Sequence, residues 1–447
     1  MKKKDSRLFD LLLIIIGIFF FFFIGEKGYV LSRDSEIYIN GYYGTTVMPL
    51  YIFFMDCLKF IFGTQAYLNV AILIQGVLAI AASIFLSKYL QKIFNLQLWQ
   101  VLIVYVLSFL PYAYSLPTHI ATHEIMTEGV AFSIFYFFFV FYFDGIREMN
   151  WLKFGISEVI SILLIFIRSQ LLILVPALIV GGSILFVRKC KVSYKKIGML
   201  IGIFSVLILG GFFVIKSTNS INLFRFLDGT QIADALVGRT IYISDKEDIK
   251  LFQDKDVQGA FQVLYDFADD NNQRYTYNTE SGKARFDKIT EGVNFITRDS
   301  WMLLVDYCET NGWHYTRSEQ FQTDIAMMLI LNHMDLFLIN FFELAFPSLV
   351  AAIFIQKESI YILCSFIAVI LYGLGILLAG LDKRKKNSCL FYLLVMLVLI
   401  INVILVNILF MGLQRYVVYT FGLYYISLFI MFCDLVGAVR NRVCRSV

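Results

Sequence analysis

The sequence predicts an all-α polytopic membrane protein with about ten transmembrane helices, and three observations support this prediction. The 447 residues are 59% hydrophobic and 16% charged, whereas a soluble domain carries about 25% charged residues. The apolar residues gather in runs of roughly 18–22, the length that crosses the hydrocarbon core as a helix. Basic residues lie in the loops between alternate runs. Because a bilayer offers no partner for free backbone groups, each run is expected to be a helix, and the composition excludes a soluble protein.

The apolar runs occur at 8–25, 66–87, 98–115, 126–143, 154–167, 170–187, 197–215, 358–380, 389–411 and 417–437. The first run follows a basic N-terminus and resembles a secretory signal. It is long and lacks a small-x-small cleavage site, so we expect an uncleaved first helix. The seven cysteines are scattered and contain no CxxC pair, so they indicate neither a disulfide framework nor a zinc site.

The basic residues follow one topology. They occupy the N-terminus, alternate loops and the C-terminal tail: Lys2, Lys3, Lys4, Arg7, Lys88, Lys92, Arg147, Lys153, Arg188, Lys189, Lys191, Lys195, Lys196, Lys383, Arg384, Lys385, Lys386, Arg440, Arg442 and Arg445. The positive-inside rule then places both termini in the cytoplasm of a multi-pass plasma-membrane protein. The net charge of +4 does not indicate nucleic-acid binding, because these residues lie in membrane loops.

The same topology divides the chain into three parts. Residues 1–215 form an N-terminal transmembrane module with a first outer loop at 26–65, and residues 358–447 form the C-terminal helices. Between the seventh and eighth helices, 216–357 is long enough for a mixed extracytoplasmic domain. It carries an amphipathic stretch near 321–345, and its segment 340–355 is expected to be interfacial or re-entrant.

The first outer loop holds two carboxylates, Asp34 and Glu36, just beyond the first helix, with Tyr38 nearby. A carboxylate at the mouth of a membrane cavity can act as a general base towards an incoming hydroxyl. The alternative is a solvated acidic loop in which Arg33 pairs with a neighbouring acid.

The second outer loop contains His119, His123, Glu124 and Glu128. The two histidines, four residues apart, would share a helix face, with a glutamate as third metal ligand. The order is not His-Glu-x-x-His, and a metal site needs three or four converging ligands. We therefore expect no metal or cofactor, although a divalent cation stays open, and we expect these residues to line a substrate cavity. Glu128 lies near the membrane boundary, where an ionisable group is costly unless it faces a wet cavity.

Two arginines occur at predicted outer helix ends, Arg415 after the ninth helix and Arg168 after the fifth. A guanidinium there can bind a phosphate in a bidentate manner. The alternative for each is an interfacial arginine that extends its charge to the headgroup region.

These features together resemble the bacterial GT-C glycosyltransferases, akin to protein O-mannosyltransferases and lipid A aminoarabinose transferases. The resemblance rests on an acidic residue after helix one with Tyr38 four residues on, the stretch Gly41-Tyr42-Tyr43-Gly44, Pro49-Leu50-Tyr51, and "IFG" before "YLNVAILIQGVLAI". The turn after Arg168, with Pro176, is also similar. The likeness covers roughly 8–187, and beyond 216 it is only architectural.

The resemblance implies an enzyme that moves a sugar from a polyprenyl-phosphate donor to a surface or lipid-linked glycan outside the cell. Asp34 matches the position of the catalytic base, and Glu36 departs from the usual adjacent acids, so either is a candidate. Arg415 or Arg168 would bind the donor phosphate. Two alternatives stay open, an O-antigen-type repeat-unit polymerase or ligase and a lipid or glycan transporter. Few intrahelical charges and no inverted repeat stand against a transporter.

Overall fold

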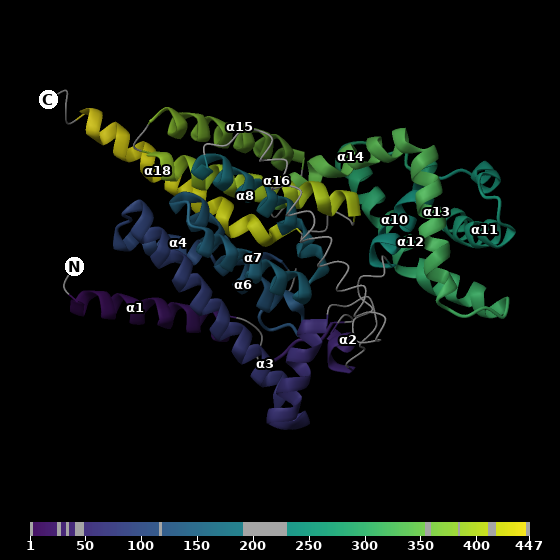
Figure 1. Cartoon of the computed structure of the whole chain (residues 1–447), viewed down its shortest axis with the longest axis horizontal. Coiled ribbons are helices and arrows are strands. Elements are labelled where there is room, and N and C mark those ends of the chain that lie inside the picture. The colour runs from purple at the N-terminus through teal and green to yellow at the C-terminus, as the bar shows by residue number, and fades with distance from the viewer. Residues whose placement is uncertain are drawn as a thin grey trace.

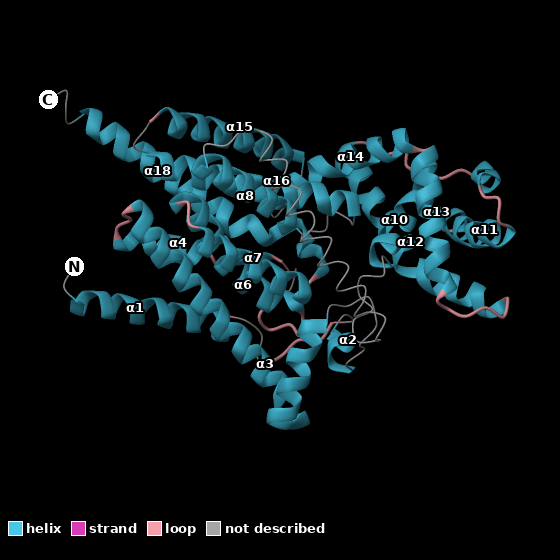
Figure 2. Cartoon of the chain, in the orientation of Figure 1, coloured by secondary structure: helices cyan, strands magenta, loops and turns pink. Residues whose placement is uncertain are grey.

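A computed structural model describes residues 3–24, 28–32, 35–40, 49–115, 119–190, 230–353, 359–382, 385–409 and 417–443. The regular elements in these residues are helices, and no strand forms among them (Figure 2). A single isolated bridge in the described chain joins Val30 to Glu124. The predicted all-α class is confirmed for this part of the protein.

The N-terminal half begins with α1 (Lys3–Ile18), which continues as a π-helical turn, η1 (Phe19–Phe23). The following elements are α2 (Ser35–Asn40), α3 (Pro49–Phe94), α4 (Leu98–Leu107), α5 (Leu110–Tyr114), α6 (Thr127–Glu148), α7 (Trp151–Ile167), η2 (Ser169–Ile173) and α8 (Leu174–Cys190). The predicted run 197–215 lies outside the described residues.

The C-terminal half contains a helical group and a second set of apolar helices. The helical group consists of α10 (Thr230–Ile243), η4 (Lys246–Leu251), α11 (Lys255–Asp270), η5 (Tyr275–Tyr277), α12 (Gly282–Thr310), α13 (Arg317–Asn332) and α14 (Met334–Ile353). The apolar set consists of α15 (Ser359–Leu381), α16 (Lys386–Leu409), η7 (Val418–Thr420) and α18 (Phe421–Val443).

Five described helices are long and apolar enough to cross a membrane. They occupy Leu50–Phe94, Thr127–Glu148, Gln170–Val187, Lys386–Ile408 and Val418–Gly437. The number becomes six if α13 and α14 count as one broken span, since they meet at a bend of 95°. The chain is therefore a helical membrane protein by the length and composition of its helices.

Gly63 interrupts the longest helix. Its φ of +74° lies in the left-handed region that glycine tolerates, so α3 is two helices joined at a kink. The kink lies just before the predicted apolar run 66–87, which forms the second part of α3. The predicted run ends at 87, where the sequence becomes polar. The helix itself continues to Phe94, because polar residues can also form helical turns.

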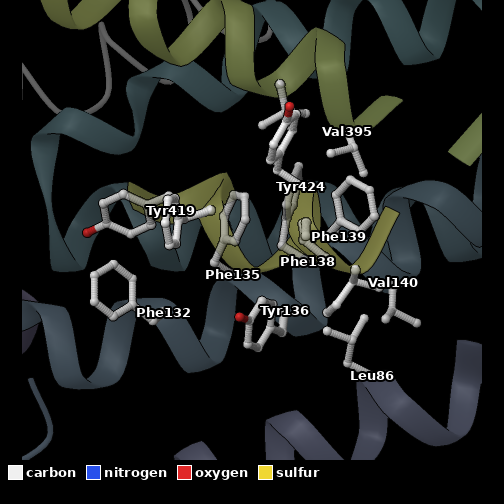
Figure 3. Packing of buried hydrophobic residues seen from close by; sticks show 14 of the residues in the cluster. Leu86, Phe132, Phe135, Tyr136, Phe138, Phe139, Val140, Val395, Tyr419 and Tyr424 are labelled. Atoms are coloured by element: carbon white, nitrogen blue, oxygen red, sulfur yellow. The ribbon is translucent and has the colours of Figure 1, made fainter. Parts of the chain in front are cut away.

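The core of the bundle is built on the aromatic residues of α6. Figure 3 shows Phe135, Phe138 and Phe139 of this helix between α16 and α18 on one side and α3 on the other. The Phe135 ring lies 5.8 Å from that of Tyr419, and the Phe138 ring stacks on Tyr142 at 5.4 Å. Such large, interlocking rings fix the positions of the helices around α6.

Both ends of the described chain lie at one end of the bundle, and α2 and the helical group α10–α13 lie at the other (Figure 1). The predicted basic loops pair with acids: Lys88 with Asp10, Arg147 and Lys153 with Asp144, and Lys385 with Asp434. Tyr89, next to Lys88, also donates to Asp144 at 2.7 Å. The basic loops that the sequence predicts on the inner side are thus linked to neighbouring helix ends by ion pairs and a hydrogen bond.

The close approach of α6 and α7 gives a first prediction. A Cβ at Gly145 would lie 2.8 Å from the backbone nitrogen of Phe154, and the backbone cannot yield as a flexible side chain does. Gly145→Ala is therefore expected to lower the thermal unfolding midpoint of the purified protein. Overpacking of this kind costs about 1–3 kcal/mol.

Gly155 in α7 is the matched control, because nothing lies within 4 Å of an added Cβ. Gly155→Ala should leave the midpoint unchanged or raise it, since alanine favours a helix by about 1 kcal/mol over glycine. Equal midpoints for Gly145→Ala and the parent protein would contradict the close packing of α6 on α7.

Candidate functional site

The second outer loop is a largely buried segment of turns and bends that is tied to the first outer loop. Val30 donates its N–H to the His123 carbonyl at 2.8 Å and accepts from the Ile125 N–H at 3.2 Å. These bonds form the parallel bridge between Val30 and Glu124. The expectation of a helix face shared by His119 and His123 is wrong, because the backbone between them makes a turn, with the His123 N–H bonded to the Ile120 carbonyl at 2.9 Å, and no helix forms there.

The two histidines have different partners. His119 donates from Nε2 to the Glu124 carboxylate at 3.1 Å. The buried His123 donates from Nε2 to the Phe21 carbonyl at 2.5 Å, which holds the loop against the end of the first helix. Over the described residues, no three His, Cys, Asp or Glu side chains gather as metal ligands.

Gln75 joins α3 to this loop from inside the bundle. Its side-chain amide donates to the carbonyls of Thr122 and Glu124 at 3.0 and 3.1 Å, and its Oε1 accepts from the Tyr51 hydroxyl at 3.0 Å. Gly129 leaves room for this contact, because a Cβ there would lie 2.8 Å from Gln75 Oε1. The Tyr38 ring packs edge-on against Tyr51, with centroids 4.9 Å apart. One polar side chain thus connects both outer loops.

Below the loop, Glu128 and Arg168 form an ion pair at the ends of α6 and α7. Glu128 is fully buried and the Arg168 side chain is 12% exposed. Arg168 also donates to Thr127 Oγ1 and to Gln170 Oε1, both at 3.0 Å, and Thr127 donates to Glu128 at 3.1 Å. Arg168 can reach these partners because α7 ends at Ile167 and its own backbone is extended.

The described part of the first loop continues to α2. Ser32 and Ser35 are hydrogen-bonded to each other, with 2.9 Å from the Ser32 N–H to the Ser35 hydroxyl. Glu36 is exposed in the first turn of α2, whereas Tyr38 is buried. Asp34 and Arg415, the predicted base and phosphate ligand, lie outside the described residues.

The structure therefore brings together Tyr38, His119, His123, Glu124, Glu128 and Arg168 of the predicted site. Glu124 and Glu128 both interact electrostatically with Tyr51, so the two acids and the tyrosine share one neighbourhood. Tyr51 and Gln75 also belong to this neighbourhood and were not among the predicted site residues. A signal for Gln75 was present, because it is a polar residue within an apolar run, where an unpaired amide is costly.

This arrangement supplies hydrogen-bonding groups and a buried charge pair at the outer-loop end of an apolar bundle. Carboxylates accept from hydroxyl groups, and a guanidinium held by a buried carboxylate is fixed in direction. Such a site suits a polar ligand that carries hydroxyl and anionic groups. Comparison of the chain with models of protein families, with curated protein sequences and with solved structures gives no match.

The buried ion pair gives a second prediction. Glu128→Gln removes the carboxylate that pairs with the buried guanidinium of Arg168, and breaking such a pair costs about 3–5 kcal/mol. We expect Glu128→Gln and Arg168→Gln each to lower the thermal midpoint strongly. The double variant should lose less than the sum of both, because the pair acts as a unit.

The exposed pair Glu247–Lys250 is the matched control, with side chains 75% and 74% exposed. Its single variants, Glu247→Gln and Lys250→Gln, should change stability by about 0–1 kcal/mol. Additive losses in the Glu128 and Arg168 cycle would show that the two side chains do not interact in the folded protein.

Proposed function

We propose that this chain is a polytopic membrane glycosyltransferase of the GT-C type, which transfers a sugar from a polyprenyl-phosphate donor to a surface or lipid-linked glycan. The observation that supports it best is the docking of the first outer loop, through Val30 and Tyr38, beside the buried Glu128–Arg168 pair. The sequence resemblance assigns the catalytic base to this loop. A lipid-linked donor needs a polar site of this kind at the membrane boundary.

The proposal includes about ten transmembrane helices, because the apolar runs are long enough and the basic loops alternate. Both termini would be cytoplasmic, and the site and the segment 216–357 would lie outside the plasma membrane. The arrangement of the described chain supports this topology, since its termini lie at the end opposite to α2 and the helical group (Figure 1). Membrane lipids are the surrounding partner, and no nucleic acid takes part.

Topology can be tested with single cysteines. Cys308 in the helical group is buried and unsuitable as a label site, whereas Thr310 is exposed. In a Cys57→Ser background, an impermeant thiol reagent applied to intact cells should label Thr310→Cys. It should not label Lys92→Cys, which is exposed at the predicted inner end of α3.

Permeabilised cells provide the control, because both new cysteines should then react. Labelling of Lys92→Cys in intact cells at the rate of Thr310→Cys would overturn the topology, and with it the position of the active site. The Cys57→Ser protein without a new cysteine gives the background labelling of the remaining thiols.

The proposed reaction is an inverting displacement. Asp34 removes the proton of the acceptor hydroxyl, whose oxygen bonds to the anomeric carbon as the bond from that carbon to the phosphate oxygen breaks. The polyprenyl phosphate leaves with the electron pair, so it needs no acid. Arg415 and Arg168 would stabilise its charge. Tyr38, His119, His123, Glu124 and Glu128 would line the substrate cavity, and no metal or cofactor takes part in the step.

The proposed base gives a specific prediction. A sugar hydroxyl is a poor nucleophile at neutral pH, and a positioned base contributes about 10²–10⁴ in rate. In nanodiscs supplied with a panel of polyprenyl-phosphate hexoses and pentoses, Asp34→Asn should lower transfer by at least a hundredfold, an estimate from the same range. Its near-identical shape should leave folding and donor binding unchanged.

Glu36→Gln is the matched control, because Glu36 is exposed in α2 two residues from the proposed base. A larger loss in Glu36→Gln would move the base to Glu36 and keep the mechanism. Transfer at the parent rate in both variants would reject a first-loop base, and the absence of any transfer by the folded parent protein would reject the proposed function.

A further inference from the structure

Arg239 of α10 is a buried cation at the junction between the helical group and the membrane bundle. Its side chain is 1% exposed. Nε donates to Asn340 Oδ1 of α14 at 3.0 Å, and Nη1 donates to the Asn407 carbonyl and, at 3.4 Å, to that of Ile408. Its guanidinium also lies 4.8 Å from the Phe337 ring centre. Three helices therefore meet around one charge.

The end of α16 stabilises the positive charge of Arg239 in part. Asn407 and Ile408 are in the last turn of α16, whose carbonyls have no partner within the helix and carry the negative end of its dipole. A cation at that position is stabilised. A helix end carries only about half a unit charge, so Arg239 is not fully compensated. Among the described residues, no carboxylate forms an ion pair with Arg239.

Two donors at this junction have no acceptor among the residues that the structure describes. They are Arg239 Nη2 and Asn340 Nδ2, and both are buried. The amide orientation of Asn340 is determined, because its Oδ1 accepts from Arg239 Nε. Nε and Nη2 share one edge of the guanidinium, so one N–H group of Nη2 points to the side where the Asn340 amide lies.

Leaving these donors unpaired is costly. A buried polar group without a partner loses its hydration without compensation, and the cost is greater when the group is charged. Burial lowers the pKa of Arg239 to about 10, so the group remains a cation at neutral pH. Because both donors are already out of water, an acceptor that reached them would gain hydrogen bonds without displacing their hydration.

We propose that Arg239 and Asn340 bind a phosphate-bearing anion at the junction of α10, α14 and the end of α16. A phosphate group offers several acceptor oxygens and the negative charge that the site lacks. The end of a membrane-spanning helix lies at the level of the lipid headgroups, where phosphate is abundant. Because the donors are enclosed, binding requires α10 and α14 to separate locally. The inference does not depend on the proposed transferase activity.

The phosphate can come from a lipid headgroup or from a soluble ion, and two arms of one experiment distinguish these sources. The full-length protein is placed in nanodiscs of dioleoyl-phosphatidylcholine, with or without inorganic phosphate or pyrophosphate. A second set replaces half of the lipid by dioleoyl-phosphatidylglycerol. Thermal unfolding is measured in each at constant ionic strength. In the arm that supplies the anion bound at this site, we expect the thermal unfolding midpoint to rise by at least about 2 °C over that in phosphatidylcholine alone.

Asn340→Asp tests the site directly, because it places a carboxylate beside Arg239. This variant should unfold at a higher temperature than the parent without added anion, and it should lose the anion-dependent rise. Arg239→Lys keeps the charge but loses the paired N–H donors of the guanidinium, so the anion-dependent rise of its unfolding midpoint should be smaller. Arg298→Gln is the control for charge loss, since Arg298 is an exposed arginine of α12 paired with Asp299; its rise should equal that of the parent.

Three results would overturn the proposal. One is no rise in the parent protein with either soluble anion or with the anionic lipid, which would leave Arg239 as a cap of α16. Another is an anion-dependent rise of the unfolding midpoint that is the same in Asn340→Asp and in the parent protein. The third is an anion-dependent rise of the unfolding midpoint that falls by the same amount in Arg298→Gln as in Arg239→Lys, which would show that the effect comes from general surface charge.

Discussion

The structure depends on one requirement: a loop buried at the end of an apolar bundle must find partners for all its backbone polar groups. Bonds from three directions hold the segment 119–126 in place. Gln75 donates to two of its carbonyls from α3, Val30 pairs with it from the first loop, and His123 attaches it to the Phe21 carbonyl. Removing any one of these would leave a buried group unsatisfied, at about 1–3 kcal/mol.

The same loop positions the charged groups of the candidate site. It leads directly into α6, so Thr127 and Glu128 begin the helix at a fixed place. Arg168 reaches them because α7 ends one residue earlier. A buried ion pair is weak as a source of stability but strict in its geometry, since misplacing either partner leaves a buried charge. This strictness would suit the proposed donor site, where a polar ligand is held next to lipid.

The helical group is joined to the bundle by the same kind of interaction. Arg239 donates to the last carbonyls of α16, and Ser348 of α14 donates to Asn407 Oδ1 at 2.9 Å. The two contacts couple α10 and α14 to the end of a membrane-spanning helix. A ligand that changes the contacts of Arg239 would therefore act on the bundle as well as on the helical group.

The sequence by itself determined the helical class, the positions of most described apolar helices and the break at Arg168, because length, hydropathy and backbone restrictions are local properties. It also identified Glu128 and Arg168 as candidate site residues, but not their pairing. Only the tertiary structure decided that pairing, the non-helical form of 119–126 and the position of Arg239. Arg239 and its acceptor Asn407 are 168 residues apart, and local sequence patterns carry no information about contacts that form only when distant helices pack.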